Sequence, residues 1–171
     1  MSGIIDTVGS KSGIIGSDVY PAGHVLQVLQ FEVTETNALT ETFVNLYENS
    51  ITLKSASSDI FVYMSFQAWL YAGAGFGWKL YRNNSATVTT SHTAVWTKNA
   101  LSDTNPETVW NNDQGAGVWS CFAKDSLSGF SIYDELFYGF FARKKDSAIV
   151  KLPHDNTEDG FINMLMMEVA K

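Results

Sequence analysis

The longest alternating pattern in the chain lies in residues 60–71. The even-numbered positions before residue 71 are all apolar, whereas the odd-numbered positions mix polar and aromatic side chains. Because neighbouring side chains of a β-strand point to opposite faces, this pattern predicts a strand with one face in the core. The other face carries Tyr63, Trp69 and Tyr71, large rings that suit an interface better than free water. We therefore expect this second face to be buried against another surface.

Other segments repeat the same period of two. Residues 24–33 place Val25, Leu29, Phe31 and Val33 with Gln27 on one face, and Leu26, Val28, Gln30 and Glu32 on the other. Residues 161–169 place Ile162, Met164 and Met166 opposite Phe161, Leu165, Met167 and Val169. Further strands are expected in residues 118–123, 136–144 and 147–152, and residues 34–46 read as a turn followed by an edge strand.

Two stretches read as loops, one at the glycines of residues 73–77 and a long polar one in residues 99–117. No stretch keeps a helical period. Roughly eight to ten short strands separated by turns indicate an all-β fold, a sandwich or a jelly roll. Of the two, we expect an antiparallel jelly-roll sandwich. We assign it residues 24–171.

The first 23 residues differ from this domain. They are rich in Gly, and the tetrad Ser-Gly-Ile-Ile occurs at residues 2–5 and again at 12–15. Ile4, Ile5, Ile14 and Ile15 therefore sit beside flexible glycines and cannot bury themselves, so docking on another surface would stabilise them. We expect residues 1–23 to form an extended anchoring arm; an unstructured terminus is the alternative.

Charge and composition exclude several classes of partner. The 171 residues carry 18 Asp and Glu against 11 Lys and Arg, a formal net charge of −7. Nucleic acid and anionic membranes are therefore disfavoured as partners. No apolar run reaches the ~18 residues that a spanning helix needs. The sequence also lacks the pattern of a signal peptide.

The residue types that carry chemistry do not form a recognisable motif. The three His have no metal-ligand spacing, the single Cys suits a buried strand position, and the acidic pairs fall on opposite strand faces or in a turn. These residues are His24, His92, His154, Cys121, Asp134, Glu135, Glu158 and Asp159. Residues 155–160 do not match a calcium-binding EF-hand loop, although an irregular calcium site stays open. The sequence thus predicts no catalytic residues, no cofactor, no metal site and no enzyme activity.

Three tryptophans bracket the long polar loop: Trp96, Trp110 and Trp119. Indole rings beside Asn and Asp can stack on the apolar face of a sugar, so we consider a ligand-contact role. The alternative is that these rings close one end of the sandwich.

The order of segments resembles a known family. HVLQVLQ, a Thr-rich spacer, FVYMSF, a Gly-rich turn, WKLYRNNSA, YGFFARKKDSAIV and a terminal MEV follow one another. This order resembles a domain frequent in bacteriophage virion and tail-fibre-like proteins, which is similar to the trimeric jelly rolls of the tumour-necrosis-factor and complement-head type. The likeness covers residues 24–171, and the arm resembles the N-terminal leaders of structural proteins from marine and cyanobacterial phages. The loop after Asn99 is longer and richer in Trp than that pattern, so no role is carried over to it.

The resemblance implies a homotrimer in a virion, with the arm binding other virion proteins. Two roles then compete. One is a short tail fibre or receptor-binding appendage that contacts a host glycan or receptor, and the other is a capsid decoration or head-fibre protein that stabilises the shell. A carbohydrate-binding module is a third possibility, which fits the aromatic loops but not the arm.

Overall fold

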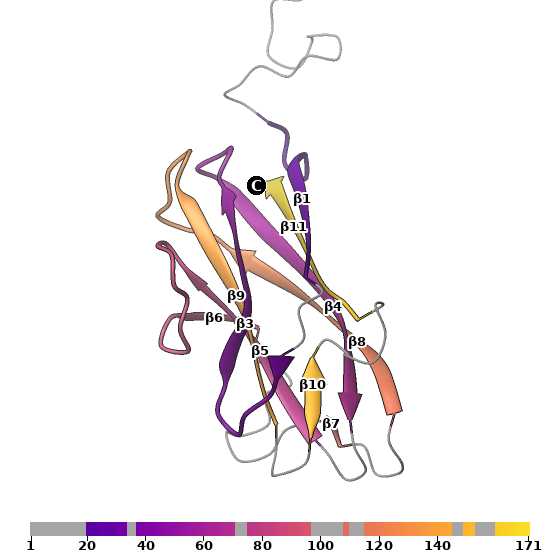
Figure 1. The fold of residues 1–171 in the computed structure, drawn as a ribbon. Helices are drawn as coiled ribbons and strands as arrows, with labels where there is room; N and C mark the ends of the chain where they lie inside the picture. Colours follow the sequence, from indigo (N-terminus) through magenta and orange to yellow (C-terminus); the bar gives the residue numbers. More distant parts are fainter. Residues whose placement is uncertain are drawn as a thin grey trace, which may run out of the picture.

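The computed structural model describes residues 20–33, 37–70, 75–96, 108–109, 115–144, 149–152 and 160–171. These residues form strands and no α-helix, in two antiparallel sheets (Figure 1). No helix in the described part is long and apolar enough to cross a membrane. The strands are β1 (Val25–Val33), β2 (Asn37–Ala38), β3 (Val44–Thr52), β4 (Ser58–Leu70), β5 (Gly75–Asn83), β6 (Thr93–Trp96), β7 (Thr108–Val109), β8 (Gly115–Ser126), β9 (Glu135–Lys144), β10 (Val150–Leu152) and β11 (Ile162–Ala170).

The strand order identifies the fold as a jelly roll. The first sheet, called sheet A, runs β1–β11–β4, and β8 pairs with the other edge of β4. The short strand β10 also pairs with β4, and β2 pairs with β10. Sheet B runs β3–β9–β5–β6, with β7 beside β5. Among the eight longest strands, sheet A thus takes the first, eighth, third and sixth, and sheet B the second, seventh, fourth and fifth. This interleaved order is that of a jelly roll, as the sequence predicted. The edge strand β3 overlaps the edge strand expected in residues 34–46 only at residues 44–46.

Strand β4 forms the centre of the core. Its even-numbered side chains from Ile60 to Leu70 are fully buried between the sheets, which confirms the predicted faces. Strand β11 alternates in the same way, with Ile162, Met164 and Met166 fully buried. The ring of Phe66 lies 4.9 Å from that of Phe140, on sheet B. Aromatic packing across the two inner faces therefore holds the sandwich together.

Three local expectations were wrong. Gly75 and Gly77 lie in β5 rather than in a loop, and β8 starts at Gly115, inside the predicted long loop. Backbone pairing explains both, because Gly77 pairs with Arg143 and Gly115 with Leu70. A ladder of backbone hydrogen bonds does not need a side chain. Val25 is exposed rather than grouped with Leu29 and Phe31, because a register shift between Val25 and Gln27 turns it outward.

Phe66→Ala should lower the free energy of unfolding by about 3–5 kcal/mol, because it removes a ring from the core and leaves a cavity. The matched control is Ser65→Ala on the opposite face of the same strand, with a change within about 0.5 kcal/mol. Denaturant melts at one protein concentration measure both. A small effect of Phe66→Ala would contradict the assignment of the faces.

Candidate functional site

The outer face of sheet A is continuous across four strands. Pairing places Leu165 of β11 beside Tyr63 of β4, and Tyr63 beside Phe122 of β8. The next row aligns Met167 with Phe61 by the same register. The rings of Phe61 and Phe122 stack with centroids 5.7 Å apart. These side chains all point away from the core, because they occupy the alternate positions of their strands.

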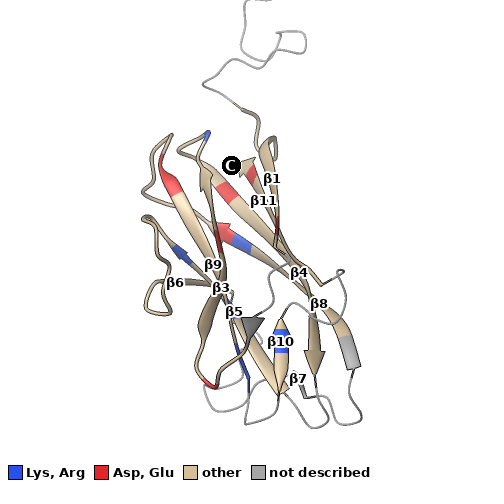
Figure 2. Cartoon of the chain, in the orientation of Figure 1, with Lys and Arg blue, Asp and Glu red and all other residues tan. Residues whose placement is uncertain are grey.

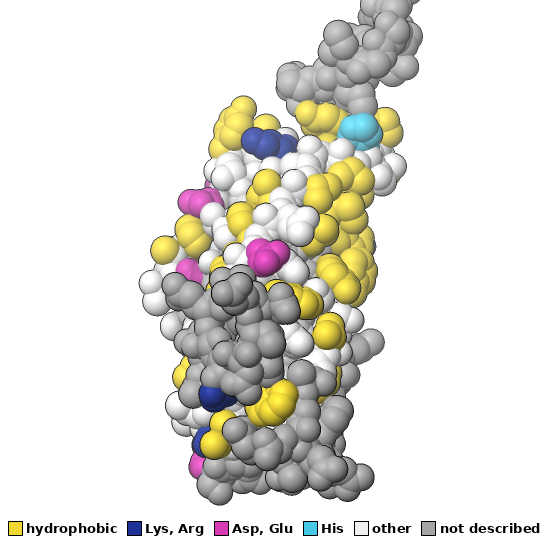
Figure 3. Space-filling model, turned by 45° about the vertical axis from the view of Figure 1, so that its right-hand side comes forward, with side chains coloured by type: hydrophobic (Ala, Val, Ile, Leu, Met, Phe, Trp, Pro, Cys, Tyr) yellow, Lys and Arg dark blue, Asp and Glu magenta, His cyan; other side chains and the backbone are white. Residues whose placement is uncertain are grey.

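We call this surface the apolar face, made up of Val25, Val28, Phe61, Tyr63, Val118, Phe122, Leu165 and Met167. Phe122 is 59% exposed and Tyr63 is 40% exposed. Figure 3 shows hydrophobic side chains gathered along the side of the domain where β1 and β11 lie in Figure 1. Five of the eight exposed large hydrophobic residues in the described chain belong to this face. Such a gathering of apolar surface on one sheet is typical of an interaction site.

The predicted interface residues fall on this face only in part. Tyr63 points outward and is exposed, as expected. Trp69 also occupies an outward position but is half-buried, beside β10. Tyr71 lies outside the described residues. The sequence reasoning missed Val118 and Phe122, whose alternation within residues 118–123 was visible but could be assigned to this face only once β8 was known to pair with β4.

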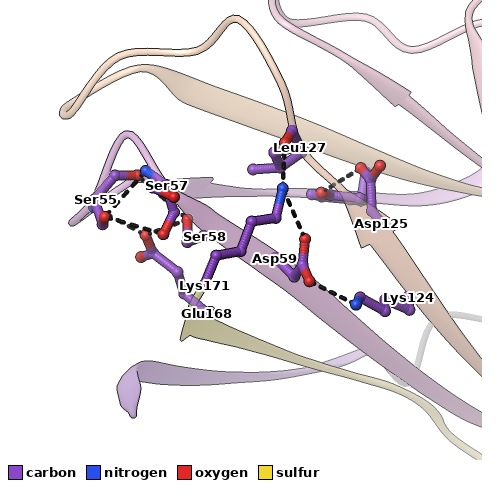
Figure 4. Close-up of polar contacts among 10 residues, drawn as sticks. Ser55, Ser57, Ser58, Asp59, Lys124, Asp125, Leu127, Glu168 and Lys171 are labelled. Carbon is purple, nitrogen blue, oxygen red and sulfur yellow. Dashed lines mark hydrogen bonds and ion pairs between the residues drawn. The ribbon is translucent and has the colours of Figure 1, made fainter. Parts of the chain in front are cut away.

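One end of the apolar face is bounded by charge. The charged residues of β4, β8 and β11 lie toward the end of the sandwich that holds the C-terminus (Figure 2). The Asp59 carboxylate lies 2.6 Å from Nζ of Lys124 and 3.0 Å from Nζ of Lys171 (Figure 4). Burial alone would raise the pKa of Asp59, but the hydrogen bonds and positive charges of the two lysines hold it below its ordinary value.

A second carboxylate, Glu168, is fully buried at the same end. It accepts hydrogen bonds from the backbone N–H groups of Lys54 and Ser55, from the Ser58 hydroxyl and from the Gln27 side-chain amide. The four donors satisfy the charge and tie β1 and the segment between β3 and β4 to β11. Figure 4 shows the contacts of Glu168 with Ser55 and Ser58. This network is structural, because its oxygens are already occupied by donors.

Two of the three tryptophans considered for ligand contact, Trp96 and Trp119, pack at the margin of the core. The Trp96 ring stacks on that of Trp78 at 5.7 Å, and the Trp119 ring meets that of Phe76 edge-on at 5.0 Å. Both indoles are half-buried, as expected for rings that close the sandwich. Trp110 lies outside the described residues. The role of these tryptophans in ligand binding stays a prediction.

The residues considered for chemistry are dispersed. Burial raises the pKa of the Cys121 thiol to about 12, which keeps it protonated and weakly nucleophilic. The Asp134 carboxylate accepts a hydrogen bond from the backbone N–H of Ser131, and Glu135 accepts one from the Ser50 hydroxyl. Within the described ranges, no group of three or more His, Cys, Asp or Glu could hold a metal ion. His154, Glu158 and Asp159 lie outside these ranges.

The predicted arm also lies largely outside the described residues, including Ile4, Ile5, Ile14 and Ile15. Its junction with the domain is described. The backbone N–H of Gly23 donates to the carbonyl of Ala170, and the N–H of Ala170 donates to the carbonyl of His24. The chain therefore enters the domain directly beside the C-terminal end of β11 and beside the apolar face.

Asp59→Asn should lower the free energy of unfolding at neutral pH by about 1 kcal/mol, the range for ion pairs with partly exposed lysines. Since the folded-state pKa of Asp59 lies below the ordinary value of 3.8, its stabilisation is present above that value and is lost as the pH falls through the folded-state pKa. The difference between wild type and variant should therefore shrink on acidification. Denaturant melts as a function of pH measure it, and a difference that stays constant with pH would contradict the ion-pair assignment.

The comparisons with known proteins do not identify a family for this chain. No family model matches the chain, and no curated protein matches it. Among solved structures, the crystal structure of the infectious bursal disease virus VP2 subviral particle is similar at a TM-score of 0.28 and 10% identity. The alignment covers 85% of this chain and 38% of the VP2 chain. A superposition this loose supports no inference about function, and the jelly-roll assignment rests on the strand order.

Proposed function

We propose that this chain is a non-enzymatic structural component of a bacteriophage particle, a homotrimer whose subunits associate through the apolar face. The observation that carries the proposal is that sheet A exposes a cluster of aromatic and aliphatic side chains on its outer face, beside polar residues such as Ser65 and Gln67. A sheet in a two-layer sandwich has one face in the core and one in water. Apolar side chains on the second face are therefore stabilised by contact with another surface. The resemblance of residues 24–171 to phage virion domains supports three copies as the assembly.

The face has the composition of a subunit interface. Tyr63, Phe61 and Phe122 form its middle, and aromatic residues are enriched where subunits meet. Leu165 and Met167 flank them on β11, and Lys124 lies at the margin, with its Nζ 5.7 Å from the centroid of the Phe61 ring.

The ends of the sandwich favour an appendage over a shell component. The arm joins the domain beside Ala170, at the same end as the C-terminus (Figure 1). Leu70 pairs with Gly115 and with Val150, so several strands of sheet A begin or end together at the opposite end. A domain anchored through its arm therefore presents that far end to the surroundings. This arrangement supports a short tail fibre or receptor-binding appendage, with capsid decoration as the alternative.

Tyr63→Asp combined with Phe122→Asp should dissociate the trimer. A carboxylate buried at a dry interface without a partner costs several kcal/mol, which is enough to shift assembly toward monomers. The control is Ile132→Asp, which replaces a residue of similar exposure (43%) outside sheet A. Sedimentation velocity measures the species present. If the double variant and the control sediment alike, the apolar face is not the subunit interface.

Deletion of residues 1–19 should leave the trimer intact but remove the protein from purified particles, because the Ile pairs would no longer bind the virion. Immunoblotting of particles grown with the truncated gene measures incorporation. Normal incorporation would rule out the anchoring role.

The same particles distinguish the two virion roles. Failure to adsorb to host cells supports an appendage, whereas normal adsorption with earlier bursting on heating supports decoration.

A further inference from the structure

A polar pocket lies on the side of the domain where β5 ends and β6 begins, away from the apolar face. Its volume is about 450 Å³, within the size range of small-molecule sites. The residues that line it and carry the argument are Arg82, Asn84, His92, Thr93, Ser128 and Phe130. They come from β5, from the segment between β5 and β6, from the first residue of β6, and from the segment that follows β8. The proposed function assigns no role to this pocket.

Residues 85–90, which connect the pocket residues Asn84 and Ser91, are held in a fixed shape. Thr87 has a φ of 70°, in the left-handed region that a Thr rarely adopts. The Glu48 carboxylate on β3 accepts hydrogen bonds from the backbone N–H groups of Thr87 and Val88, at 2.9 and 2.8 Å. Val88 is buried against sheet B. This strained segment therefore keeps its conformation before any ligand arrives, and strain of this kind often accompanies binding sites.

Two buried residues, Asp125 and Tyr138, position the Arg82 side chain. Its Nε lies 2.5 Å from the Asp125 carboxylate, which also accepts a hydrogen bond from the Tyr138 hydroxyl at 2.8 Å. Burial and the neighbouring Asp125 raise the pKa of Tyr138, so the hydroxyl stays a donor. The Arg82 guanidinium lies 4.8 Å from the centroid of the Phe130 ring, and Gly129, with a φ of 78°, forms the turn beside that ring. The guanidinium is thus fixed in place, and its charge is matched by Asp125.

The remaining groups at the pocket are neutral hydrogen-bonding groups. The Nδ1 atom of His92 accepts a hydrogen bond from the backbone N–H of Thr89 at 2.9 Å, which leaves the proton of a neutral ring on Nε2 as a donor. Asn84, Thr93 and Ser128 are exposed and add an amide and two hydroxyls. The half-buried Phe130 adds an apolar surface.

We infer that this pocket binds a neutral saccharide. A sugar offers several hydroxyls that both donate and accept, together with apolar C–H groups, and these match the amide, hydroxyl and imidazole groups beside an aromatic ring. Anionic ligands are disfavoured because the Arg82 charge is already compensated by Asp125, and apolar ligands because they would leave the polar lining unpaired. The inference goes beyond the proposed function and does not depend on it, because the pocket adjoins the end of the sandwich where the arm joins and not the far end.

The full-length protein, labelled with ¹⁵N, is titrated with free glucose, galactose, mannose and N-acetylglucosamine, and with glucuronic acid as the charged counterpart of glucose. At least one neutral sugar should give saturable amide shifts at Asn84, His92 and Thr93. Thr93→Trp, which fills the pocket, should weaken the apparent affinity by more than about tenfold. Thr90→Trp, in the same segment but not lining the pocket, should leave it unchanged, and thermal melts show that both variants fold.

Three results would overturn the inference: no neutral sugar shifts these amides, the shifts persist in Thr93→Trp, or glucuronic acid binds more tightly than every neutral sugar. Each leaves the trimer proposal standing, because the oligomeric state is measured separately by sedimentation.

Discussion

The structure depends on strict alternation in β4 and its neighbours, which places apolar side chains on both sides of sheet A. In β4, one set of side chains, which includes Met64 and Phe66, is fully buried between the sheets, and the other set includes the outward-facing Phe61 and Tyr63. The first set accounts for folding of a single chain through burial of apolar area. The second set is only partly covered within one chain, where Phe61 stacks on Phe122, and contact with another surface would cover it further. The same alternation thus connects the fold to association.

Among the residues that the structure describes, the buried charges lie at one end of the sandwich, and they organise that end. Glu168 joins β11 to β1 and to the segment before β4, while Asp59 and its two lysines close the edge of the apolar face. Asp125, a third acid nearby, holds Arg82 at the wall of the polar pocket. Satisfied polar networks of this kind fix a unique arrangement of segments, whereas apolar packing alone tolerates alternatives. The junction with the arm and the two candidate binding surfaces all adjoin this end.

Sequence periodicity predicted the all-β class and the faces of β4 and β11, because a period of two is a local property of a strand. The jelly roll was expected from the number of strands and from the resemblance to phage virion domains. Periodicity did not reveal that Phe122 lies beside Tyr63, since that contact depends on β8 pairing with β4 across some sixty residues of chain. Gly75 and Gly115 were expected in loops because glycine is a weak strand former, yet backbone pairing placed both in strands. The polar pocket was missed because Arg82, His92 and Phe130 come from separate segments and share no motif.

The central claim is that copies of the chain cover the apolar face. The molar mass of the full-length protein in dilute buffer, measured by light scattering after size-exclusion chromatography, tests it most directly. We predict the mass of three 18.9-kDa chains, unchanged on dilution into the low micromolar range. A stable mass of one chain, with Tyr63 and Phe122 facing water, would contradict the account.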